Sequence, residues 1–180
     1  MRLRAAQTSN TKILFAMCPI EPQIALRKMR SADLPAVLAI LNVVNMLPIA
    51  PSAAIPEPEV STLEVENTFV AEANGNIVGV ASYFVRSATV CETASFAVLP
   101  DWRRHGIGAL LQSARLREMR ARGASTVITQ TDRAENVRWF IRRFGYREVG
   151  SNLKRHSFGD PGIDRWTVLE LDLQSASFEP

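Results

Sequence analysis

The stretch PDWRRHGIGALL, residues 100–111, places two arginines, a histidine and two glycines directly before a helical pattern. The first N–H groups of a helix have no partner within it, and the helix dipole adds partial positive charge there. Glycines let a phosphate approach this backbone, and flanking arginines can add charge-assisted hydrogen bonds. We therefore predict a pyrophosphate-binding loop formed by Arg103, Arg104, His105, Gly106, Ile107 and Gly108.

Three other interpretations compete for this stretch. A Walker A loop needs Gly-Lys-Ser/Thr, which is absent. A dinucleotide fingerprint needs a small residue at its third glycine position, where Leu111 stands. A helix start that uses glycines only for close packing stays open on this motif alone.

The length and composition predict one folded domain. The chain has 180 residues, of which 47% are hydrophobic and 22% charged, and these values suit a single globular unit. We expect an N-terminal extension at 1–22, one domain at 23–175 and a short C-terminal tail at 176–180. Prolines at 48, 51, 56 and 58 predict a long functional loop after the first helix.

The apolar periodicity and the turn residues predict alternating strands and helices. Asn74-Gly75 is typical of a hairpin turn, Gly123 of a helix end, and Asp132 with Glu135 of a helix capping box. The predicted order is a strand and a helix in 23–46, a hairpin at 68–85, a strand at 88–100, a helix at 106–122, a strand at 125–130, a helix at 132–145, and strands at 146–154 and 165–173. This order predicts an α/β (α+β) fold: a mixed sheet flanked by helices, with a parallel crossover at 89–130.

The cysteine count and the charge pattern limit the functional classes. Cys18 and Cys91 form no disulfide framework and no metal-binding pair, so we expect reduced thiols, a cytoplasmic location and no metal. No apolar run approaches the roughly 18 residues that a membrane span needs. Residues 101–155 carry 13 Lys/Arg and five Asp/Glu, while the rest of the chain carries eight Lys/Arg and 13 Asp/Glu. The basic block suggests an anionic partner, or simply solvated helix faces.

Two motifs together resemble the GCN5-related N-acetyltransferase (GNAT) family. The segment SFAVLPDWRRHGIGALL, residues 95–111, matches the family's pattern of a strand, a proline, an aromatic residue and Arg-x-x-Gly-x-Gly at a helix start. The segment NVRWFIRRFGYREVG, residues 136–150, resembles its second signature. The resemblance covers about residues 24–173 and implies the GNAT acyl-CoA N-acyltransferase fold, a mostly antiparallel mixed sheet in which one parallel pair of strands splays apart.

The resemblance also implies how acetyl-CoA (coenzyme A) would bind as the acyl donor. Backbone groups of Phe96, Ala97 and Val98 would bond the pantetheine arm, and an amide there would polarise the thioester carbonyl. The loop at 103–108 would hold the pyrophosphate. Asn136 matches an asparagine near the pantetheine and the sulfur, with helix capping as its alternative role.

Glu92 is the candidate catalytic base, because it lies on the same strand and matches the glutamate base of the histone-acetylating branch. Its alternative role is solvent exposure or an ion pair, for example with Arg86. Many family members carry a tyrosine that protonates the leaving thiolate; here Ile141 occupies that position, and Tyr146 is expected in the core. The general acid is therefore unassigned.

The implied function is transfer of an acetyl group to a primary amine of a small molecule or a protein. The alternative is an acyl-CoA-binding or sensing domain without turnover, and nucleic-acid binding ranks last because no motif supports it. Acidic residues near the proline-rich loop, Glu57, Glu59 and Glu64, favour a cationic acceptor. His156 and Asp164, in the last loop, could touch the substrate. The resemblance also allows a homodimer, and we expect neither nucleic acid nor membrane as a partner.

Overall fold

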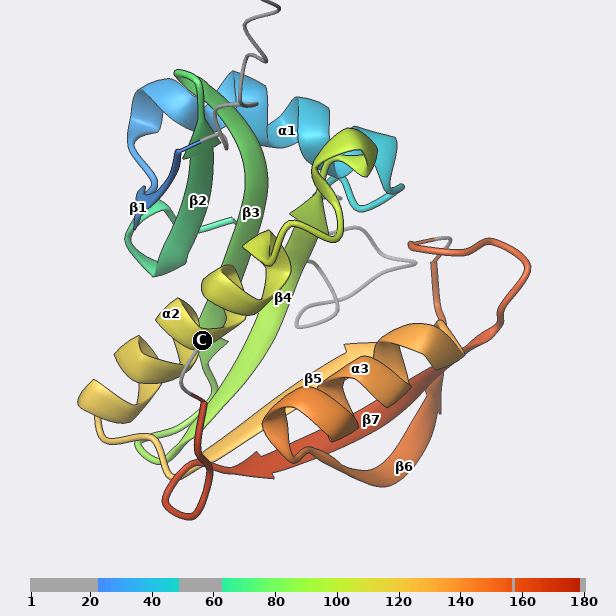
Figure 1. Cartoon of the computed structure of the whole chain (residues 1–180). Helices are drawn as coiled ribbons and strands as arrows, with labels where there is room; N and C mark the ends of the chain where they lie inside the picture. The colour runs from blue at the N-terminus through green and yellow to red at the C-terminus, as the bar shows by residue number, and fades with distance from the viewer. Residues whose placement is uncertain (1–22, 49–62, 157, 179–180) are drawn as a thin grey trace, which may run out of the picture.

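Seven strands form one mixed sheet in the order β1-β2-β3-β4-β5-β7-β6 (Figure 1). The structure is a computed structural model that describes residues 23–48, 63–156 and 158–178. Its strands and helices are β1 (Ile24–Lys28), α1 (Leu34–Val43), β2 (Thr68–Ala73), β3 (Asn76–Val85), β4 (Val90–Val98), α2 (Ile107–Ala121), β5 (Thr126–Thr131), α3 (Ala134–Phe144), β6 (Arg147–Leu153) and β7 (Arg165–Asp172). Among the strands of the described residues, only β4 and β5 pair in parallel, which confirms the predicted mixed sheet.

Some predictions fall on residues outside this description. The N-terminal extension at 1–22 lies outside it, as do Glu57 and Glu59 in the proline-rich loop.

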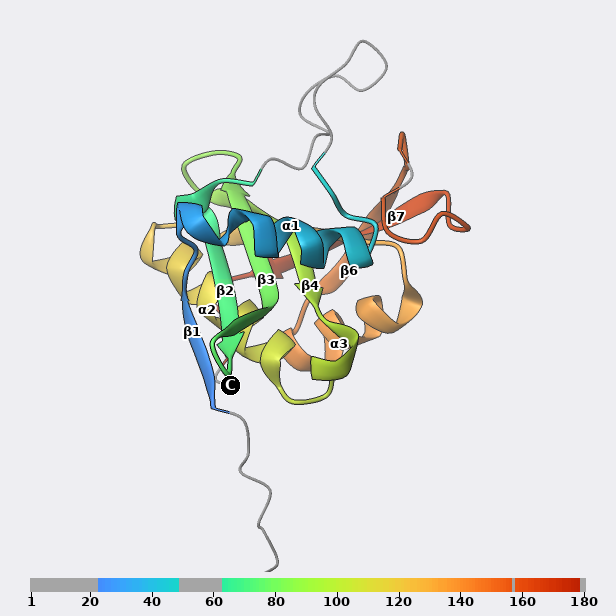
Figure 2. The ribbon, with the colours of Figure 1, turned by 90° about the horizontal axis from the view of Figure 1, so that it is seen from above.

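Helices cover both faces of the sheet (Figure 2). On one face, α1 packs Val37 and Leu41 against Val70 and Val80 of β2 and β3. On the other face, α2 packs Ile107 and Leu111 against alanines and a valine of the same strands. Helix α3 lies on this second face, where its phenylalanines join leucines of β7 and the C-terminal half of α2 in one core cluster.

Two glycines let the first half of the sheet form. Asn74 and Gly75 have φ angles of 52° and 77°, which the predicted tight hairpin between β2 and β3 requires. Gly79 allows α2 to sit close to β3, because a Cβ there would lie 3.0 Å from Leu111 Cδ1 and 3.3 Å from Ile107 Cγ2.

The parallel strands β4 and β5 pair over a short distance and then separate. Only Val90–Glu92 of β4 pair with Thr126–Ile128 of β5. Beyond this point β4 stays with β3 and β5 stays with β7, so the two strands diverge (Figure 1). The sheet therefore has a V-shaped split at its centre, as the resemblance implied.

A β-bulge in β4 coincides with this split. Val80 of β3 opposes Ala97 and Ser82 opposes Ala94, so one β3 residue faces two residues of β4. Ser95, in the bulge, has a φ of 44°. In a regular strand, residues an even number apart share a face. Yet Cys91 packs with the α2 core and Ala97 with the α1 core. The bulge therefore exchanges the two faces of the strand.

The predicted capping box of α3 is wrong. The N-cap residue is Arg133, and no side chain caps the helix. Asp132 instead accepts hydrogen bonds from Lys154 Nζ and from the backbone N of Asp160, both at 2.6 Å. A buried lysine binds the carboxylate more strongly than a local amide does.

Candidate active site

A cleft of about 1510 Å³ opens where β4 and β5 separate. It is lined by the end of α1, the β4 residues beyond the last β5 pair, the loop before α2, the first turns of α3, and the loop between β6 and β7. No helix in the described part of the chain is long and apolar enough to cross a membrane. Among the described residues, no cluster of His, Cys, Asp and Glu is arranged to hold a metal.

Unpaired amides at the start of α2 form one wall of the cleft. The backbone N of Arg103 bonds Pro100 O and that of Leu110 bonds Gly106 O, but the N–H groups of residues 104–109 have no partner within the described ranges. Positive φ angles of 66° at Arg104 and 78° at Gly106 turn the chain into the helix. Consecutive free N–H groups at a helix N-terminus form an anion-binding site.

The side chains of this loop divide into two groups. Arg103 and Arg104 line the cleft together with Gly106 and Gly108. Arg103 Nε donates to Val98 O at 3.1 Å, which ties the loop to the end of β4. His105 bonds the carbonyl of Arg103 and lies outside the cleft lining. Ile107 is 1% exposed and packs in the core, so this residue offers the site only its amide.

The β4 edge forms the second wall. Phe96, Ala97 and Val98 all line the cleft. The Phe96 ring stacks on Trp139 of α3, with centroids 5.7 Å apart. A Cβ at Gly108 would come within 3.5 Å of Phe96 and 3.8 Å of Trp139. The edge of β4 that faces β5 has no strand partner beyond Glu92, so it can accept an extended chain as an added strand.

Asn136 lies in the first turn of α3 and lines the cleft. Its Nδ2 donates to Thr131 Oγ1 at 3.3 Å, which joins the helix to the end of β5. Asn136 is not the N-cap of α3, so its alternative role as a helix cap is wrong.

Glu92 lies at the base of the cleft, beside the point where the strands part. Arg86 Nε donates to its Oε2 at 2.7 Å and Gln130 Nε2 to its Oε1 at 2.9 Å. The side chain is 12% exposed. The predicted Arg86 pair is therefore present, and the carboxylate also faces the cleft. Hydrogen bonds to both oxygens hold it in one orientation.

Ile141, which occupies the position of the expected tyrosine, does not face this site. Ile141 is 38% exposed and lies outside the cleft lining, whereas Trp139 and Phe140 of the same helix line it. Tyr83 and Tyr146 are both buried in the core, and burial raises the pKa of each, for Tyr83 to about 12. No tyrosine occurs among the described residues that line the cleft.

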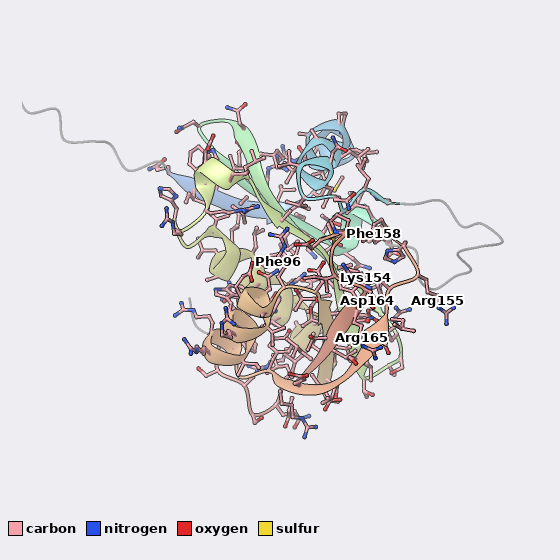
Figure 3. All side chains as sticks on the ribbon, turned by 90° about the vertical axis from the view of Figure 1, so that its right-hand side faces the viewer. Phe96, Lys154, Arg155, Phe158, Asp164 and Arg165 are labelled. Atoms are coloured by element: carbon pink, nitrogen blue, oxygen red, sulfur yellow. The ribbon has the colours of Figure 1, made fainter. Side chains whose placement is uncertain are left out.

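The loop between β6 and β7 is tied to both sides of the V. Lys154 Nζ bonds Asp132 Oδ2, and the two side chains are 4% and 6% exposed. Lys154 also donates to the carbonyls of Phe158 and Asp160, at 2.9 Å each. Gly159 N donates to Asn45 O at 2.9 Å, and Asn45 Nδ2 donates to Gly159 O at 3.2 Å. We call residues 154–156 and 158–160 the anchored loop; Figure 3 labels its Lys154, Arg155 and Phe158.

Of the two substrate-contact candidates in this region, only one faces the cleft. His156 lines it, and its ring lies 4.0 Å from that of Phe158. Asp164 is not part of the lining and offers its carbonyl to Lys154 N. Near the first loop, Glu64 accepts a hydrogen bond from Asn67 Nδ2 and also lies outside the lining.

Sequence reasoning missed the Lys154–Asp132 pair and the buried Arg115. No local pattern marks the pair, because its members are 22 residues apart. A signal for Arg115 does exist. It lies four residues after Leu111 and eight after Ile107, on the apolar face of α2.

A family profile described as an acetyltransferase (GNAT) domain matches residues 64–148. No curated protein matches the chain. Similar solved structures include Ard1 from Thermoplasma volcanium, with a TM-score of 0.66 and 21% identity, covering 83% of this chain and 97% of that one. The ribosomal-protein-S18-alanine N-acetyltransferase from Escherichia coli has a TM-score of 0.64 and 19% identity, covering 88% of this chain and 99% of that one.

A third similar structure is N-acetylglutamate synthase from Neisseria gonorrhoeae, solved with coenzyme A and N-acetyl-glutamate. It has a TM-score of 0.61 and 19% identity, and the match covers 84% of this chain and 35% of the synthase. The chain thus spans about a third of the synthase's length. Identities this low establish a shared fold, so the chemistry is argued from the cleft.

Proposed function

Because the chain belongs to the GCN5-related N-acetyltransferase (GNAT) superfamily, we propose that it transfers an acetyl group from acetyl-CoA to a primary amine by direct attack. The run of unpaired amides at residues 104–109, beside the free edge of β4, carries this proposal. Coenzyme A has a pyrophosphate that suits the first feature and an amide-bearing pantetheine arm that suits the second. Similar structures solved with coenzyme A support this choice of donor.

The donor's binding groups follow from this arrangement. The amides of residues 104–109, with Arg103 and Arg104, would hold the pyrophosphate. The backbone of Phe96–Val98 would bond the pantetheine, and one amide there would face the thioester oxygen. Asn136, held by Thr131, would contact the arm near the sulfur. Phe96 and Trp139 would exclude water from the thioester.

The reaction needs a neutral amine at the base of the V. An alkyl ammonium has a pKa of about 10, so a base must take its proton. Glu92 would accept it, directly or through a water. The amine nitrogen then bonds the carbonyl carbon while a β4 amide stabilises the developing oxyanion. The C–S bond breaks, the nitrogen gives up its second proton to water to become the amide, and water delivers a proton to the leaving thiolate, because the described lining of the cleft holds no tyrosine that could donate one.

Two acceptor classes deserve testing first. One similar protein, N-acetylglutamate synthase, is named for an acetylated amino acid. Another is named for the alanine of a ribosomal protein. The anchored loop and the end of α1 also line the cleft, and in this proposal they border the acceptor. We propose that the acceptor is a primary amine on a small molecule or on a protein.

One observation favours the alternative, a domain that binds acyl-CoA without turnover. Both carboxylate oxygens of Glu92 already have a partner, Oε2 in Arg86 and Oε1 in Gln130, so the group would have to exchange a partner to accept a proton. The absence of a tyrosine from the described lining points the same way.

Thiol release separates the two functions. Incubation with acetyl-CoA and a panel of amino acids, polyamines and peptides should release coenzyme A with at least one amine. Glu92→Gln should lower kcat by about 100-fold or more. Glu118→Gln is the matched control, because Glu118 is also ion-paired but lies outside the cleft. Tight acetyl-CoA binding without turnover on any amine would favour the alternative.

A further inference from the structure

Arg115 of α2 is an arginine buried inside the protein. Its side chain is fully covered, and Nη2 has no hydrogen-bond partner among the described residues. None of the ion pairs found in residues 23–48, 63–156 and 158–178 includes it. Burial lowers its pKa to about 10, so the group stays charged at neutral pH. An unpaired buried charge is unfavourable for folding, so its contacts need an explanation.

Those contacts converge on the β4 bulge. Arg115 Nη1 donates to Ser82 O of β3 at 3.0 Å and to Ala94 O of β4 at 3.2 Å. Ser82 and Ala94 are the register pair at which regular pairing stops before Ser95. A bulge disrupts the ladder of hydrogen bonds between two strands, and here a guanidinium N–H bonds a carbonyl of each strand.

The same guanidinium also touches the cleft wall. Arg115 Cζ lies 4.7 Å from the centroid of the Phe96 ring. Phe96 is the second residue of the bulge, after Ser95, and it lines the cleft. Arg115 thus contacts both the residue before the bulge and a bulge residue that lines the cleft.

Two buried polar residues hold the guanidinium in place. Arg115 Nε donates to Gln112 Oε1 at 2.6 Å, and Gln112 Nε2 donates to Tyr146 Oη at 3.0 Å. Gln112 is one turn earlier on α2, and Tyr146 precedes β6. The bulge is therefore connected through Arg115 to a chain of hydrogen bonds across the core.

We propose that Arg115 is a positioning residue that fixes the β4 bulge and so aims the backbone of Phe96–Val98 into the cleft. This inference rests on the proposed function, in which that backbone binds the pantetheine arm and faces the thioester. Arg115 acts through the strand and touches neither substrate. Its loss should therefore misplace the thioester while the pyrophosphate loop, at the N-terminal end of α2, still binds.

Hydrogen exchange with coenzyme A tests this directly. In the wild type, coenzyme A should slow exchange at residues 94–98 and at 104–109. In Arg115→Met, which keeps the length and removes the donors, the slowing at 94–98 should fall at least tenfold and that at 104–109 should remain. With acetyl-CoA and the best amine, kcat should fall about 100-fold while KM for acetyl-CoA changes less than about threefold.

A matched control separates positioning from general destabilisation. Leu116→Ala also weakens α2 packing at a fully buried position, and it should leave kcat and both exchange effects unchanged at temperatures where it is folded. If Arg115→Met does not fold, Arg115→Lys replaces it. An ammonium lacks the planar fork that bonds two carbonyls and Gln112. Arg115→Lys should therefore also lose slowed exchange at 94–98 and kcat while it keeps the slowing at 104–109, but both losses should be smaller than in Arg115→Met.

The outcomes are distinct. An Arg115 variant that keeps the slowing at 94–98 and the wild-type kcat would overturn the positioning role. A wild type in which coenzyme A slows neither segment would instead overturn the proposed cofactor site.

Discussion

Gly106 sets the geometry of the predicted phosphate site at the scale of a single residue. Its φ of 78° lets the chain turn into α2, and a Cβ there would meet no atom within 4 Å. A substitution is therefore sterically possible and costs about 1 kcal/mol of backbone strain. Any side chain added at this point would extend beside the amides of residues 104–109.

Gly106→Glu should weaken coenzyme A binding by about 100-fold or more, because its carboxylate competes with the pyrophosphate for these amides. Isothermal titration with coenzyme A measures the change. Gly123→Glu is the control, since Gly123 has a φ of 91° and open space at the other end of α2. It carries the same strain and charge away from the cleft. Equal affinity in the two variants would place the pyrophosphate elsewhere.

At the scale of elements, local patterns predicted what local forces determine. Asn74-Gly75 predicted the β2–β3 hairpin, and Gly106 with Gly108 predicted the loop before α2. The apolar periodicity predicted the last strand, β7. The bulge in β4 was not predicted, because Ser95 carries no turn signal and the stabilising Arg115 contacts join residues 21 and 33 positions apart. The capping box of Asp132 with Glu135 was a wrong prediction for the same reason, because the real partner of Asp132 is Lys154, 22 residues away.

The anchored loop gives a prediction at this scale. Gly159 has a φ of 69°, and a Cβ there would overlap with Asp132 Oδ2. Gly159→Ala should therefore displace the carboxylate from Lys154 and release the loop, at a cost of about 2 kcal/mol in stability.

In the proposed arrangement the loop borders the acceptor, so KM for the amine should rise about tenfold in Gly159→Ala, while coenzyme A affinity stays unchanged. Steady-state kinetics and titration measure the two effects. Gly162→Ala is the control, because Gly162 lies in the same connection between β6 and β7 but outside the anchored loop, and its nearest contact would be an ordinary 3.4 Å. A Gly159→Ala enzyme with the wild-type KM would exclude a role for the loop in acceptor binding.

At the scale of the whole molecule, the basic block from 101 to 155 has several separate uses. Arg103 and Arg104 line the cleft. Arg115 is buried, and Arg147 pairs with Glu170. Arg120 bonds the carbonyl of Ala176 and lies 4.2 Å from the ring centroid of the buried Phe178. Composition could not separate these roles, because each depends on which distant segment a side chain meets.

The acid stability of the molecule follows from another long-range cluster, in which Arg27 of β1 bonds Asp33 before α1 and Glu72 of β2. The hydrogen bond from Arg27 is the main cause that lowers the pKa of Asp33 from 3.8 to about 2. The folded state therefore binds this proton more weakly than the unfolded chain does. The stabilisation is complete above about pH 4 and is lost as the pH falls through about 2.

Asp33→Asn should lower the free energy of unfolding at pH 7 by about 1 kcal/mol, a modest value because the pair is partly exposed. The difference between the variant and the wild type should then shrink between about pH 4 and about pH 2, where the wild-type carboxylate becomes protonated. Urea unfolding at a series of pH values measures both curves. Glu148→Gln, at an exposed position of β6, should follow the wild type throughout. A difference that stays constant down to pH 2 would mean that Arg27 does not hold Asp33 ionised.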